Sequence, residues 1–128
     1  MKRSNLEQLR DNGILAANTG NLGMAITCFE KVLELTPDPS SKDFSNAGLA
    51  RRKNGQPNLA KNHFESAIKR NPSNLDAAKN LVLCMLDSDE SNKAIIFLKE
   101  INKQHRDSEL RQLEFKTRLH YRSPLSAV

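Results

Sequence analysis

The sequence contains no tryptophan, and aromatic residues make up only 5% of its 128 positions. Glycine and proline are also scarce, with five of each. They occur at regular places along the chain, which indicates punctuation between structured segments rather than disorder. Hydrophobic residues reach 38% and charged residues 27%, an ordinary balance for a soluble protein. The length predicts a single domain over residues 1–128, large enough to bury roughly two-thirds of its unfolded surface.

Cysteine and long apolar runs are nearly absent as well. Cys28 and Cys84 lie far apart without a CxxC partner, so we expect two free thiols in a reducing compartment. The longest apolar run, Leu81–Leu86, is far too short to span a membrane. The N-terminal residues 1–13 carry no apolar segment typical of a signal peptide. These absences predict a cytoplasmic protein without membrane insertion.

Helical periodicity begins near Asn5. Apolar and small residues recur at three- and four-residue steps over 5–18 and again over 22–35, which predicts two amphipathic helices. Between them, Gly20 suits the left-handed conformation that commonly ends a helix, and Asn21 suits the N-cap position of the next helix. Pro37 then ends the second helix.

The same pattern repeats along the chain. Ala60, Phe64 and Pro72 lie 35 residues after equivalent Ala, Phe and Pro residues of the first unit. A third unit follows at an offset of 34, with a turn at residues 87–89, but Val82 and Arg106 replace its Gly and Pro. We therefore predict repeats over about 6–39, 41–74 and 75–108, and a capping helix over about 109–122.

The spacing of these residues resembles the tetratricopeptide repeat (TPR) family. The family pattern W-x2-L-G-x2-Y, A-x3-F, P corresponds here to two series of residues. In the first unit these are Leu9, Asn12, Gly13, Ala16, Ala25, Phe29 and Pro37. In the second unit they are Phe44, Ala47, Gly48, Arg51, Ala60, Phe64 and Pro72. The resemblance implies an all-α, right-handed helical solenoid of three helix-turn-helix repeats with a C-terminal capping helix.

The repeated residue types have a physical explanation. Gly48 and Ala60 are small where two antiparallel helices should approach closely, and Phe64 fills the space beside them. Arg51 stands where the family usually has an aromatic residue, so we expect its stem to pack and its charged head to reach solvent.

The resemblance also implies a concave groove, lined by the first helix of each repeat, that binds an extended peptide. Carried over by register, its residues are Arg10, Ile14, Ala17, Ser45, Asn46, Leu49, Arg52, Lys53, Lys79, Asn80, Leu83 and Leu86. Ile14, Leu49 and Leu83 should form an apolar row surrounded by positive charge. Such a groove favours a protein or peptide partner with an apolar anchor and acidic flanks. The function predicted is a non-enzymatic interaction module, or adaptor.

Some members of the family hold a C-terminal carboxylate with Lys and Asn residues of this groove. Arg10 and Asn46 resemble part of that set. Ile14 and Asp76, however, stand where an Asn and a Lys would be needed. We therefore do not expect this chain to bind chaperone tails in that way.

A second interpretation is a basic helical-repeat protein that contacts RNA or DNA phosphates. The net charge is +5, and residues 41–74 hold seven Lys or Arg against two Asp or Glu. No aromatic residues are interleaved with these cations for base stacking, so we expect a protein partner in preference to nucleic acid.

A third interpretation is a self-associating scaffold. The helix predicted near the C-terminus is two-faced, because Leu110, Leu113 and Tyr121 point one way while other apolar residues point nearly the opposite way. The residues that we expect to mediate self-association are Ile96, Phe97, Phe115 and Leu119. This interpretation predicts a homodimer through the C-terminal third, although a missing C-terminal domain explains the same surplus.

No pattern of residues indicates catalysis, a metal site or a cofactor. His63, His105 and His120 lie far apart and lack metal-ligand spacing to cysteine or to one another. We expect His63 to be solvated on an outer helix position. There is no glycine-rich phosphate loop, and the acidic residues at 87–90 lack the spacing of an EF-hand. We therefore predict that the protein is not an enzyme and needs no cofactor.

Overall fold

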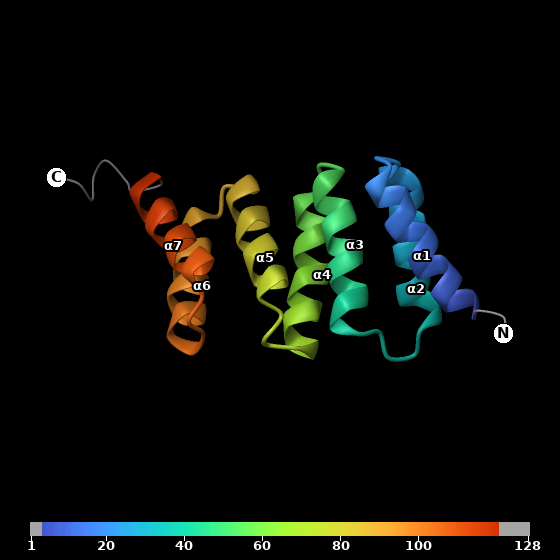
Figure 1. The fold of residues 1–128 in the computed structure, drawn as a ribbon. Helices are drawn as coiled ribbons and strands as arrows, with labels where there is room; N and C mark the ends of the chain where they lie inside the picture. Colours follow the sequence, from blue (N-terminus) through green and yellow to red (C-terminus); the bar gives the residue numbers. More distant parts are fainter. Residues whose placement is uncertain (1–3, 121–128) are drawn as a thin grey trace. The chain divides into compact units, whose positions relative to one another are not determined.

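The computed structural model describes residues 4–120, and every regular element within that range is an α-helix. The helices are α1 (Asn5–Asn18), α2 (Leu22–Leu35), α3 (Ser41–Lys53), α4 (Pro57–Arg70), α5 (Leu75–Asp87), α6 (Ser91–Gln104) and α7 (Ser108–His120). They form three helix-turn-helix repeats followed by one further helix (Figure 1). The predicted fold class is therefore confirmed, whereas the exact repeat boundaries stay a prediction. The predicted end of the last helix, at 122, and Tyr121 lie outside the described residues.

Short polar side chains set where the helices begin. Ser4 accepts a hydrogen bond from the backbone N–H of Glu7, and Asn21 accepts one from that of Met24. Ser40 and Asp43 form a reciprocal capping box at the start of α3. Pro57 opens α4, where the absence of its N–H has no cost.

The turns inside the repeats need a left-handed residue. Gly20 and Gly55 have φ angles of 81° and 74° in the first two turns, and the left-handed conformation of Gly20 is the one that the sequence predicts. In the third turn Asp89 takes this conformation, with a φ angle of 58°. Asp tolerates it better than most residues with a side chain, which explains how a repeat without the turn glycine still forms.

Contacts divide the chain into two compact units, Met1–Cys84 and Met85–Val128. The prediction of a single domain over 1–128 stays a prediction. Among residues 4–120, no helix is long and apolar enough to cross a membrane.

The first unit packs its helices through small residues. α1 packs on α2, α2 on α3, and α3 on α4. One cluster of buried residues joins the first three helices, and its members are Ala16, Ala25, Phe29, Ala47 and Ala50. Phe64 is fully buried in the next repeat. The predicted packing residues therefore do form the core.

The close approach of two helices explains Gly48. A Cβ atom built on Gly48 would lie 2.9 Å from ring carbons of Phe64, and one built on Gly13 would lie 2.6 Å from the ring of Phe29. Carbon atoms at such distances overlap. Each phenylalanine ring therefore rests on the backbone of the helix opposite, and only glycine allows this.

Gly48→Ala should destabilise the protein by about 1–2 kcal/mol, as measured by chemical denaturation. The added methyl group must displace the ring of a buried side chain, which outweighs the gain in helix propensity. Gly23→Ala is the matched control, because a Cβ there meets nothing within 4 Å. That variant should be stabilised by about 0.4–1 kcal/mol. Equal shifts in the two variants would contradict the packing of Phe64 against Gly48.

The second unit is built around α6 and α7. Leu98 of α6 and Leu110 of α7 are fully buried, and Asn102 donates hydrogen bonds to the carbonyl of Leu110 (3.3 Å) and the carboxylate of Glu114 (2.8 Å). α7 thus packs on α6. Its own outer face stays uncovered, since 68% of Phe115 is exposed.

The residues predicted to mediate self-association differ in exposure. Ile96 and Leu119 are exposed like Phe115, at 69% and 67%, whereas Phe97 is half-buried. Their role in self-association stays a prediction.

Candidate functional site

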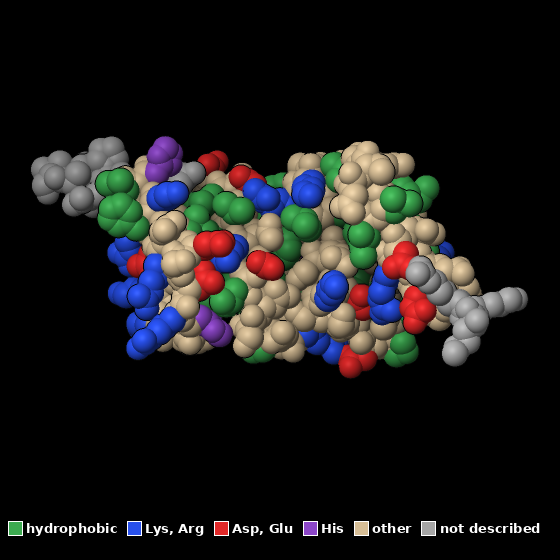
Figure 2. All heavy atoms as spheres, viewed as in Figure 1, with side chains coloured by type: hydrophobic (Ala, Val, Ile, Leu, Met, Phe, Trp, Pro, Cys, Tyr) green, Lys and Arg blue, Asp and Glu red, His purple; other side chains and the backbone are tan. Residues whose placement is uncertain are grey.

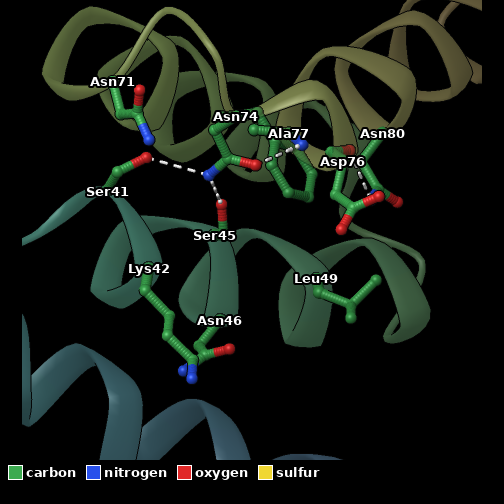
Figure 3. A pocket seen from close by; sticks show the side chains of 11 residues that line it. Ser41, Lys42, Ser45, Asn46, Leu49, Asn71, Asn74, Asp76, Ala77 and Asn80 are labelled. Atoms are coloured by element: carbon green, nitrogen blue, oxygen red, sulfur yellow. Dashed lines mark hydrogen bonds between the residues drawn. The ribbon is translucent and has the colours of Figure 1, made fainter. Parts of the chain in front are cut away.

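Two hollows lie beside α3 in the first unit. The larger has a volume of about 410 Å³ and lies between α3 and the start of α5 (Figure 3). Its lining residues are Ser41, Lys42, Ser45, Asn46, Leu49, Phe64, Asn71, Asn74, Asp76, Ala77 and Asn80. The smaller, of about 120 Å³, lies between α1 and α3, with Phe29 of α2 also in its lining. Its lining residues are Ile14, Ala17, Asn18, Phe29, Asn46, Leu49, Ala50 and Lys53.

One face of α3 lines both hollows. Lys42, Asn46, Leu49 and Lys53 recur at three- and four-residue steps and so share that face. Asn46 and Leu49 line both hollows, which makes the two a continuous surface across α3.

Hydrogen bonds hold one wall of the larger hollow in place. Asn74 donates from its side-chain nitrogen to the hydroxyls of Ser41 (2.8 Å) and Ser45 (2.9 Å), as Figure 3 shows. Its side-chain oxygen accepts from the backbone N–H of Ala77 (3.0 Å), which caps α5. Ser41 in turn donates to the carbonyl of Ala67 (2.7 Å). This wall is therefore formed before any ligand binds.

The amide of Asn46 differs from that of Asn74. Asn46 is half-buried, and within residues 4–120 its side chain makes no hydrogen bond. Figure 3 shows it pointing to the same side of α3 as Lys42. An amide offers two donors and an acceptor, so Asn46 can bind the main chain of a ligand that crosses from one hollow to the other.

Seven of the twelve predicted groove residues line these hollows, and they are Ile14, Ala17, Ser45, Asn46, Leu49, Lys53 and Asn80. Ile14 and Leu49, two members of the predicted apolar row, both line the smaller hollow. The other five predicted residues, Arg10, Arg52, Lys79, Leu83 and Leu86, line neither of the two. Whether any of the twelve binds a ligand stays a prediction.

Arg10 is engaged in an ion pair. Its guanidinium donates two hydrogen bonds to the carboxylate of Asp43, at 2.8 and 3.0 Å, and Asp43 is 5% exposed. Burial by itself would raise the pKa of Asp43. The hydrogen bonds from Arg10 and Ser40, with the charge of Arg10, outweigh burial and hold that pKa below its ordinary value of 3.8. The positive charge predicted for Arg10 in the groove is thus compensated within the protein.

The prediction that His63 is solvated is wrong. Only 19% of its side chain is exposed, and its ring nitrogen Nε2 lies 2.5 Å from the carboxylate of Glu30. Arg51 approaches the same carboxylate (3.4 Å) and donates to the side chain of Gln56 (3.1 Å). Its charged head therefore binds protein groups, where we expected it to reach solvent. Side chains of α2, α3 and α4 meet here, and helical periodicity within α4 could not show that.

Sequence reasoning also missed Asn74 and Asp43. Both carry a signal in hindsight, because Asn before a helix and Asp three residues after Ser40 are capping residues. Within residues 4–120, no group of three His, Cys, Asp or Glu side chains is placed to hold a metal ion. Cys28 and Cys84 are both buried, and neither forms a disulfide.

Comparisons with known proteins identify this arrangement of helices. Two sequence profiles described as Tetratricopeptide repeat match the chain, one over residues 51–118 and the other over residues 13–39. Curated protein sequences give no match.

Solved structures share the fold at low identity. The first TPR of Spaghetti (RPAP3), bound to the HSP90 peptide SRMEEVD, has a TM-score of 0.80 at 16% identity over 92% of this chain and 94% of its own. The TPR2B domain of yeast Sti1, in a pHsp70 complex, has 0.77 at 19% identity over 90% and 97%. The Yersinia enterocolitica type III secretion chaperone SycD, in complex with a peptide of the translocator YopD, has 0.74 at 20% identity over 91% and 88%.

Proposed function

The chain belongs to the tetratricopeptide repeat family, and on that premise we propose that it binds an extended segment of a partner protein across α1, α3 and the start of α5. The observation that carries this proposal is the pair of hollows joined by Asn46 and Leu49. Two structural neighbours hold peptides and a third is in a complex with pHsp70, which supports a peptide or protein segment as the ligand here. In this role the protein acts as an adaptor, without catalysis.

The two hollows suit different side chains. Ile14, Ala17 and Leu49 give the smaller hollow an apolar lining, and its volume suits one aliphatic side chain of the partner. Lys53 borders it and favours a neighbouring acidic residue. Six of the eleven residues that line the larger hollow have hydroxyl or amide side chains, and Lys42 and Asp76 are its charged residues, so it offers hydrogen bonds to a polar side chain.

The ligand should be an internal segment rather than a free C-terminus. In this chain the charge of Arg10 is compensated by Asp43, and the carboxylate of Asp76 borders the larger hollow. A terminal carboxylate would meet the negative charge of Asp76 there, with Lys42 as the one cation in the lining and no arginine. We therefore expect no binding of a chaperone tail such as SRMEEVD at this site.

Basic residues of α3 and α4 do not favour nucleic acid. Arg51 approaches Glu30, and Arg70 forms an ion pair with Asp38 while its guanidinium lies 6.0 Å from the centre of the Phe44 ring. Contacts to phosphate would have to replace these interactions. Because these arginines already interact with groups of the protein itself, we expect a protein partner in preference to nucleic acid.

Asn46→Ala combined with Leu49→Ala should weaken peptide binding at least tenfold, which corresponds to about 1.4 kcal/mol. Peptides selected from a random library displayed on phage serve as the probe, because their fused C-termini carry no free carboxylate. Affinity is then measured by fluorescence anisotropy with amidated synthetic peptides. We expect the selected sequences to share an aliphatic residue next to an acidic one.

Leu59→Ala combined with Asn62→Ala is the matched control. It removes the same side chains from exposed positions of α4 that line neither hollow, so affinity should not change. If no peptide is enriched, or if the Asn46 and Leu49 variant binds the enriched peptides as tightly as wild type, the proposed site is wrong.

A further inference from the structure

The outer face of α7 carries apolar side chains that nothing in the second unit covers. Phe115 and Leu119 lie one helical turn apart and are 68% and 67% exposed. Leu110 and Thr117, on the opposite face, are buried. Large apolar side chains grouped on an exposed face commonly mark a contact surface.

The charges around this face are positive. Arg111 and Lys116 flank Phe115 along the helix, and both are exposed. Residues 91–120 as a whole hold seven Lys or Arg against four Asp or Glu, and Figure 2 shows these basic side chains gathered over α6 and α7. A twofold dimer through α7 would place these cations against their own copies, which is unfavourable. The occupant of this face should therefore be acidic.

The outer face of α1 has the complementary character. Glu7, Asp11 and Leu15 follow one another at four-residue steps and so lie on one side of the helix. Leu15 is 63% exposed, while Gly13 and Ala16 face the interior. Met24, at the start of α2, adds a further exposed apolar side chain. Over residues 4–36, four acidic residues outnumber two basic ones.

We propose that α7 of one molecule packs on α1 of a second copy. Phe115 and Leu119 would then contact Leu15, while Arg111 and Lys116 would face Glu7 and Asp11. The two surfaces differ, so a pair of molecules keeps one unused α7 face, on one partner, and one unused α1 face, on the other. Contacts of this heterologous kind build open chains of molecules rather than closed dimers.

Analytical ultracentrifugation of the full chain tests this assembly. The average mass of the wild type should rise with concentration beyond that of a dimer, and it should fall at high salt because the charge pairs are screened. Phe115→Ser with Leu119→Ser should give a monomer. Glu7→Lys with Leu15→Ser should also give a monomer, whereas the control Leu59→Ser, at another exposed leucine, should assemble as the wild type does.

Mixing the two monomeric variants is decisive. Each keeps the face that the other lacks, so an equimolar mixture should form a one-to-one dimer and nothing larger. Circular dichroism confirms that each variant is folded. A monomeric wild type, a wild type that stops at the dimer and ignores the α1 changes, or a mixture that stays monomeric would each overturn the proposal.

Discussion

Phe64→Ala should lower the free energy of unfolding by about 3–5 kcal/mol, which is the largest effect that we expect from a single substitution in this protein. Phe64 is 0% exposed, and its ring rests on the backbone of Gly48. Alanine would leave a cavity that the neighbouring helices cannot close. The residues around it are small, and their side chains are too short to fill the space. Urea denaturation followed by circular dichroism measures the change.

Phe115→Ala is the matched control for this measurement, at a concentration low enough to keep the protein monomeric. The side chain removed is the same, but it is 68% exposed, so the change should stay within about 0.5 kcal/mol. A small effect at Phe64 together with a large one at Phe115 would show that the repeat register assigned here is wrong.

Arg10→Met should cost about 2–3 kcal/mol at neutral pH, because it leaves the carboxylate of Asp43 buried without its guanidinium partner. The loss stays below the roughly 3–5 kcal/mol typical of fully buried pairs, since 34% of the Arg10 side chain is exposed. Arg118→Met is the control. Arg118 pairs with Glu114 on the surface of α7, and removing it should cost only about 0.3–0.5 kcal/mol.

The cost of Arg10→Met should depend on pH in one direction. The pKa of Asp43 in the folded wild type lies below 3.8, so the ion pair stabilises the protein above that pH and the stabilisation is lost as the pH falls through the folded pKa. The difference in unfolding free energy between wild type and variant should therefore be largest near neutral pH and shrink below about pH 4. A difference that is constant from pH 3 to pH 7 would contradict the role given to this pair.

The repeats could be predicted because their signals are local or recur at a fixed period. Gly48 and Phe64 lie 35 residues after Gly13 and Phe29. In the structure Phe29 packs on Gly13, and Phe64 packs on Gly48 in the same way. The turn at Gly20 and the cap at Asn21 depend only on neighbouring backbone groups. Such features need no knowledge of how distant segments pack.

Polar contacts between neighbouring repeats could not be predicted in the same way. Arg10 with Asp43, Glu30 with His63, Asp38 with Arg70, and Ser41 with Asn74 each join residues 32 or 33 positions apart. That separation is close to the repeat period, so adjacent repeats bring these side chains together. Which partner each side chain meets depends on the rotation of one helix pair against the next.

The candidate site also combines features that could be predicted from the sequence with features that depend on contacts between distant residues. The resemblance to the family implied that α3 lines the site, and helical periodicity then placed Asn46 and Leu49 on one face of α3. Only the tertiary structure decided that Arg10 is neutralised by Asp43, that Asn74 braces one wall, and that Asn46 remains unbonded between two hollows. A charge or an amide acts on a ligand only when no other part of the chain engages it, and that depends on contacts between residues far apart in the sequence.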